Sequence, residues 1–164
     1  MAQSNYNRAA AVEYAKQYAY TKNPKYFDFS LLGGNCTNFV SQCLVAGEAK
    51  MNYSYPLGWY YKNLQNRSPS FTGVEYLYNF LVRKNNSVGP RAIETTVEKL
   101  EVGDIIQLSF DGIGFSHSLL VTELNFDNPY DPFVTTNTYD VYNKPLSWYS
   151  FAKARFLHIV SHDM

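Results

Sequence analysis

The chain has 164 residues, a length typical of one domain, and we expect a single catalytic domain over residues 1–164 with one core. Lys and Arg residues number 14 and so do Asp and Glu residues, which leaves no positive excess for binding nucleic acid or an anionic membrane. No apolar stretch approaches the roughly 18 residues of a membrane span, and polar residues 1–8 lack the apolar centre of an export signal. We therefore expect a soluble monomer.

Helical spacing marks the first half of the chain. Small and apolar residues recur at this spacing over residues 6–20, which predicts a first helix with Ser4 or Asn5 as its N-cap. A second helix is expected to start near Cys36 and to stop at Gly47, because glycine is the commonest residue just past a helix end. The N-terminal half therefore contributes helices.

The second half has a different character. Residues 48–73 show no clean period and are rich in aromatic side chains, so we expect a long, functional loop region with at most one helical turn. A third helix is predicted over residues 74–81. Alternating apolar residues then predict four strands, at residues 105–110, 116–124, 133–138 and 155–160. Helices followed by strands indicate an α+β fold, with N-terminal helices packed on a C-terminal antiparallel sheet.

Cys36 is the most informative single residue. The pair Gly33 and Gly34 precedes it and places its thiol in the first turn of the predicted helix, where free N–H groups and the helix dipole favour an anion. A thiol pKa lowered by ~3 units would represent about 4 kcal/mol and make Cys36 a nucleophile. Cys43 shares the helix, lies ~10 Å away and so cannot form a disulfide with Cys36. We expect it to be a small buried side chain.

A cysteine nucleophile needs a base, and the chain has three histidines. His117 stands at the entrance of a predicted strand, and Asn137 on the next strand falls near the same end of the ladder, so its side chain could orient the ring. His117 could instead be a satisfied strand histidine, and Asn137 could close a turn. His158 and His162 lack the glutamate of a metalloprotease helix, so we expect no metal site there.

Four segments resemble a known family when they are taken together and in this order. They are Tyr-Asn-Arg-Ala-Ala-Ala-Val-Glu-Tyr-Ala at 6–15, Asn-Cys-Thr-Asn-Phe-Val-Ser-Gln at 35–42, Gly-Asp-Ile-Ile at 103–106 and His-Ser-Leu-Leu-Val-Thr at 117–122. The chain resembles the amidase domains of bacterial cell-wall enzymes, which look like relatives of the papain-like CHAP peptidoglycan hydrolases. The resemblance covers roughly residues 6–160. Taken alone, Asp104 in the third segment is more typical of a turn that leads into a strand.

The resemblance implies a papain-like fold and assigns roles to individual residues. Cys36 would be the nucleophile, His117 the general base and then the general acid, and Asn137 the residue that orients the ring. The family pattern more often has His-Thr followed by an acidic residue where this chain has Asn137, so Asp140 is a competing third member. Asn35 also departs from the pattern, since an acidic residue is common there.

The function implied by the resemblance is cysteine-dependent hydrolysis of an amide in the peptide part of peptidoglycan. The bond could be the sugar–peptide amide, as in an amidase, or a peptide bond, as in an endopeptidase, and neither cleavage needs a cofactor. We expect Ser116 and the aromatic residues Trp59 and Tyr60 to bind substrate, although Trp59 and Tyr60 could also belong to the core.

The expected place of action is the cell wall, either as a domain of a secreted protein or as a phage-type lysin released by another factor. Two alternatives stay open at this point. One is a papain-like transpeptidase, in which an amine replaces water as acceptor. The other is a catalytically idle module that binds cell-wall sugar through its aromatic loop region.

Overall fold

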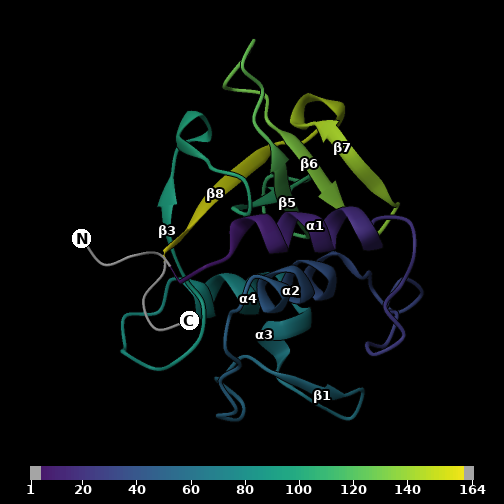
Figure 1. The fold of residues 1–164 in the computed structure, drawn as a ribbon, viewed down its shortest axis with the longest axis vertical. Coiled ribbons are helices and arrows are strands. Elements are labelled where there is room, and N and C mark those ends of the chain that lie inside the picture. The colour runs from purple at the N-terminus through teal and green to yellow at the C-terminus, as the bar shows by residue number, and fades with distance from the viewer. Residues whose placement is uncertain (1–4, 161–164) are drawn as a thin grey trace.

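The computed structural model of the protein describes residues 5–160, which form an α+β fold with the helices gathered on one side of an antiparallel sheet (Figure 1). The helices are α1 (Arg8–Tyr18), α2 (Cys36–Ala46), α3 (Pro69–Thr72) and α4 (Val74–Leu81), with 3-10 turns η1 (Val97–Lys99) and η2 (Leu146–Trp148). The strands are β1 (Tyr61–Asn63), β2 (Asn66–Arg67), β3 (Arg91–Thr95), β4 (Ile105–Ser109), β5 (His117–Glu123), β6 (Phe133–Thr136), β7 (Val141–Pro145) and β8 (Lys153–Val160).

The main sheet has six strands in the order β3-β8-β4-β5-β6-β7, all antiparallel to their neighbours. The four strands predicted from the sequence correspond to β4, β5, β6 and β8, and the sheet adds two unpredicted strands, β3 and β7, at its edges. β1 and β2 form a separate small hairpin within the segment predicted to be a loop. In the part of the chain that the structure describes, no helix is long and apolar enough to cross a membrane.

The helix predictions are confirmed with small changes at the ends. α2 begins at Cys36 and ends before Gly47, whose N–H donates to the carbonyl of Cys43 at 2.9 Å. α1 is shorter than predicted, because the side chain of Asn7 caps it by accepting a hydrogen bond from the N–H of Ala10 at 3.0 Å. Asn5 is therefore not the cap, and Ser4 lies outside the described residues.

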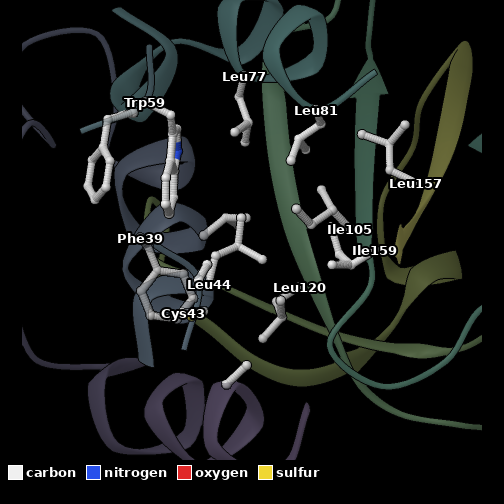
Figure 2. Packing of buried hydrophobic residues seen from close by; sticks show 14 of the residues in the cluster. Phe39, Cys43, Leu44, Trp59, Leu77, Leu81, Ile105, Leu120, Leu157 and Ile159 are labelled. Atoms are coloured by element: carbon white, nitrogen blue, oxygen red, sulfur yellow. The ribbon is translucent and has the colours of Figure 1, made fainter. Parts of the chain in front are cut away.

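The main core lies between the helices and one face of the sheet (Figure 2). Successive strand residues point to opposite faces, so Ile105 and Leu120 face the helices whereas Ile106 and Leu119 join a second cluster on the other face. β4 is consequently buried along its whole length. The helix side of the core also includes Phe39, Cys43, Leu44, Trp59, Leu77, Leu81, Leu157 and Ile159.

A buried carboxylate ties the start of α1 to the sheet. Asp104 is completely buried just before β4, and its side chain accepts a hydrogen bond from Arg8 at 2.7 Å and lies 2.9 Å from Nδ1 of His158. The backbone N–H groups of Glu101 and Ile159 donate to the same carboxylate at 2.8 and 2.9 Å. Asp104 therefore does more than form the predicted turn, because it joins three segments that are distant in the sequence.

Candidate active site

The loop before α2 turns sharply at its two glycines and presents Cys36 at the helix start. Gly33 and Gly34 have φ angles of 93° and 106°, in the left-handed region that side chains disfavour. Asn35 then closes the loop, because its Oδ1 accepts a hydrogen bond from the N–H of Phe29 at 3.0 Å. As the sequence predicts, Cys36 is the first residue of α2.

α2 is held against β5 by a hydrogen bond between two buried hydroxyl groups. Oγ1 of Thr37 lies 2.8 Å from Oγ of Ser118, and Gln107 on β4 donates to the same Ser118 oxygen at 3.1 Å. Thr37 follows Cys36 in the chain, and Ser118 follows His117. The contact between Thr37 and Ser118 therefore brings Cys36, the predicted nucleophile, and His117, the predicted base, to the same end of the α2–β5 interface.

Cys36 and His117 line one cavity of about 410 Å³. Ser116, which the sequence analysis expected to bind substrate, also lines it. No Asp, Glu, Lys or Arg is among its lining residues in the described part of the chain, so the cavity suits an uncharged group such as an amide. The remaining lining residues are Ser30, Leu31, Gly33, Gly34, Phe110, Thr138, Tyr139 and Tyr149.

The electrostatic prediction for Cys36 is wrong. Its side chain is almost completely buried, and this burial raises the pKa of the thiol above the ordinary value. Hydrogen bonding from the backbone N–H of Ser118, and from the hydroxyl and N–H groups of Thr37, opposes the rise without cancelling it. The helix start does supply hydrogen-bond donors, but removal of the sulfur from water destabilises the thiolate more than these donors stabilise it.

His117 is also buried, with 7% of its surface exposed, and its burial lowers the ring pKa from 6.5 to about 4. Its ring packs against Phe110 and Tyr149, with centroid distances of 6.1 and 5.5 Å. At neutral pH the imidazole is therefore uncharged and keeps one nitrogen free to accept a proton. At neutral pH the Cys36 thiol and the His117 ring are therefore both uncharged.

The structure gives Asn137 other hydrogen-bond partners than the predicted one. Its Nδ2 donates to the carbonyls of Tyr18 and Thr21 at 2.7 and 3.2 Å, which satisfies acceptors at the end of α1. Its Oδ1 accepts a hydrogen bond from Asn35 at 2.7 Å. With both ends of the amide engaged, Asn137 does not orient His117 in this structure.

The competing candidate, Asp140, pairs instead with Lys22 at 3.1 Å on the surface. Neither of the two residues that the sequence offered as third members therefore holds the imidazole of His117 in place.

The aromatic residues predicted to bind substrate belong to the interior instead. Trp59 is fully buried, donates from Nε1 to Ser41 at 3.1 Å and packs between Phe71 and Phe80. Tyr60 is also buried, and neither Trp59 nor Tyr60 lines the cavity that holds Cys36. Trp59 and Tyr60 therefore belong to the core, and the prediction that they bind substrate is wrong.

Sequence reasoning missed Tyr149, which follows η2 and lines the cavity beside His117. Its hydroxyl is buried, and its pKa is raised to about 12, mainly by burial and further by the nearness of Cys36. No local motif marks this residue, because it reaches the site through the packing of a loop on the outer face of the sheet.

A group of possible metal ligands, Glu101, Asp104 and His158, lies near the start of α1 and away from this cavity. The Arg8 guanidinium already contacts Asp104 at 2.7 Å and lies 3.6 Å from Glu101, so a cation occupies the position that a metal ion would need. These residues fit an ion-pair network around the buried Asp104 better than a metal site. His162, the other histidine considered for metal, lies outside the described residues.

Comparison with known proteins identifies the family. A family model described as "Putative amidase domain" matches residues 5–160. The chain belongs to this family. Among curated proteins, the chain is 35% identical over 166 residues to a Bacillus subtilis (strain 168) protein named "Uncharacterized protein YhbB", a match that covers 94% of the chain and 50% of that relative. The chain thus spans about half the length of this relative. No solved structure is significantly similar to the chain.

The description of the putative amidase domain family points to amide hydrolysis. Cys36 and His117 both fall within the matched residues, as do the cavity and the contacts that bring the two side chains together.

Proposed function

We propose that the protein hydrolyses an amide bond by cysteine catalysis, with Cys36 as nucleophile and His117 as general base and acid. The observation that carries this proposal is that both side chains line one uncharged cavity. The residues that follow them, Thr37 and Ser118, are 81 positions apart in the sequence and are in contact. A thiol, an imidazole and an open cavity are the minimum for covalent acyl transfer.

In the first step, the sulfur of Cys36 attacks the amide carbonyl carbon while the thiol proton moves to the free nitrogen of His117. The oxygen of the tetrahedral intermediate accepts a hydrogen bond from the backbone N–H of Cys36, which has no partner within the helix because it lies in the first turn. The imidazolium then gives its proton to the leaving nitrogen, the C–N bond breaks and an acyl-enzyme remains.

In the second step, His117 takes a proton from water, and the resulting hydroxide adds to the thioester carbon. The C–S bond breaks, the carboxylic acid leaves and the proton returns to the sulfur. Neutral Cys36 and neutral His117 are restored, so the cycle needs no cofactor. The low pKa of His117, about 4, keeps the ring in its basic form at the start of each step.

We infer that the substrate is the peptide part of bacterial peptidoglycan and that the fold is papain-like. The support is the resemblance of the four quoted segments to amidase domains of cell-wall enzymes, together with membership of the putative amidase domain family. The helix-start cysteine and the strand-start histidine are consistent with a papain-like arrangement. The proposed place of action is the cell wall.

The test is clearance of purified cell walls by the protein and by a Cys36→Ala variant. The variant should fold normally and lose clearance, because it lacks the sulfur that forms the proposed acyl-enzyme. Cys43→Ala is the matched control, since this second cysteine is buried in the core and should leave clearance intact. Undiminished clearance by Cys36→Ala would refute cysteine catalysis.

Mass spectrometry of the released fragments identifies the bond. New carboxyl and amino termini within peptides would indicate an endopeptidase, and intact sugar chains freed of peptide would indicate an amidase. Fragments joined to an added amine would instead indicate transpeptidation.

A further inference from the structure

Tyr149 lies directly against the predicted base. The centroids of the Tyr149 and His117 rings are 5.5 Å apart, with an angle of 55° between the ring planes. Trp148 also packs edge-on against Tyr149, with ring centroids 5.2 Å apart, so the tyrosine ring contacts two aromatic neighbours. Tyr149 also lines the cavity that contains Cys36.

The hydroxyl of Tyr149 is buried and has no hydrogen-bond partner among the described residues. Buried hydroxyl groups without partners are rare in folded proteins, and each one calls for a physical explanation. The ring of His117 lines the cavity, and its lowered pKa is caused by burial, without a contribution from a hydrogen bond. A tyrosine whose buried hydroxyl has no partner is therefore packed against the ring of His117.

The other candidates for holding this imidazole have partners elsewhere. Both ends of the Asn137 amide are hydrogen-bonded, to Asn35 and to carbonyls at the end of α1, and Asp140 pairs with Lys22. A histidine that acts as general base needs a group that fixes its ring orientation and its tautomer, and neither Asn137 nor Asp140 fills this role.

We propose that Tyr149 is the positioning residue of the catalytic pair, and that its hydroxyl oxygen accepts a hydrogen bond from the His117 ring N–H that points away from Cys36. This inference rests on the proposed function. The hydrogen bond fixes the tautomer in which the second nitrogen faces the thiol and can take its proton. The tyrosine keeps its own proton throughout, and its pKa of about 12 excludes ionisation at neutral pH.

The hydrogen bond matters most after the thiol proton has moved. The imidazolium that forms is then a charge in a buried position, where an acceptor oxygen is worth more than it is in water. Hydrogen bonds between catalytic groups are often long in free enzymes and shorten when substrate closes the site.

The experiment compares Tyr149→Phe, which keeps the ring and removes only the hydroxyl, with Tyr149→Leu, which removes both. Tyr130→Phe is the matched control, because Tyr130 is exposed in the β5–β6 loop and does not line the cavity. We expect Tyr149→Phe to lower kcat by about 10- to 100-fold with KM and Tm nearly unchanged, the size expected for one hydrogen bond to a charged group. Wild-type kcat in Tyr149→Phe with loss only in Tyr149→Leu would overturn the proposal in favour of a packing role.

A second readout does not depend on activity. Nitrogen NMR of the wild-type protein should show His117 in one predominant tautomer, and Tyr149→Phe should populate both. A mixture of tautomers in the wild type, or unchanged nitrogen shifts in the variant, would overturn the hydrogen bond. The failures are distinguishable: full activity of Cys36→Ala refutes the proposed function, whereas an inactive Cys36→Ala with a fully active Tyr149→Phe refutes only the role of Tyr149.

Discussion

Acidification should destabilise the protein through His117. The pKa of His117 is about 4 in the folded state and 6.5 in an unfolded chain. Between these two pH values the unfolded state is protonated at His117 and the folded state is not. The stability that His117 contributes is complete above pH ~6.5 and is lost as the pH falls towards ~4. A difference of about 2.5 pKa units corresponds to roughly 3 kcal/mol, a large part of the stability of a small domain.

The assay is urea unfolding of the wild type and of His117→Gln at several pH values between 7 and 4.5. The variant changes stability by a constant amount, but it removes the titration of His117. The unfolding free energy of the wild type minus that of the variant should therefore decrease steadily as the pH falls from 7 to 4.5. All other ionisable groups are common to the two proteins, so their contributions cancel in the comparison.

Two parallel curves would refute the reasoning, because they would show that His117 takes up a proton as easily in the folded state as in the unfolded one. The ring would then be hydrated or paired with an anion, and the description of a neutral resting pair would fall with it. A shift of the steep region to higher pH would refute only the size of the effect.

Two further predictions address the nucleophile and the residue first expected to orient the base. Iodoacetamide should modify Cys36 more slowly at pH 7 than it modifies an exposed cysteine, and the rate should increase with pH, because burial raises the thiol pKa. If mass spectrometry finds that Cys36 is modified faster than a free thiol, the result would instead indicate a thiolate–imidazolium pair. Asn137→Ala should lower the free energy of unfolding in urea by about 2 kcal/mol, since it leaves carbonyls at the end of α1 unpaired. The kcat of the folded fraction should stay within a few-fold of wild type, and a loss of about 1,000-fold in kcat would instead support a catalytic role for Asn137.

The parts of the fold that could be predicted are those with strong local signals. α2 was predicted from the glycines before Cys36 and the glycine after the helix, and the central strands from runs of buried aliphatic residues. The edge strand β7 escaped prediction because it contains Asn143, with a φ of 53°, and ends in a proline. Edge strands pair on one side only and tolerate such residues, so their sequences resemble loops.

The candidate site divides in the same way. Cys36 and His117 stand at the starts of regular elements, where sequence patterns are informative. The roles of Asn137 and Trp59 depend on which distant groups pack against them, and no pattern in their own segments distinguishes an amide that orients a base from one that closes a helix end. Tyr149 reaches the cavity from a loop 32 residues after His117, which only the folded chain brings back to the site.

The burial of both reacting groups determines how the proposed reaction must begin. A thiol with a raised pKa beside an imidazole with a lowered one does not ionise in advance, so the proton has to move as the sulfur attacks. Groups that stabilise the developing charges then act at that moment only, and these are the N–H groups near the sulfur and an acceptor for the imidazolium. The first set is present at the start of α2 and at Ser118, and the buried hydroxyl of Tyr149 is the described group best placed to be the second.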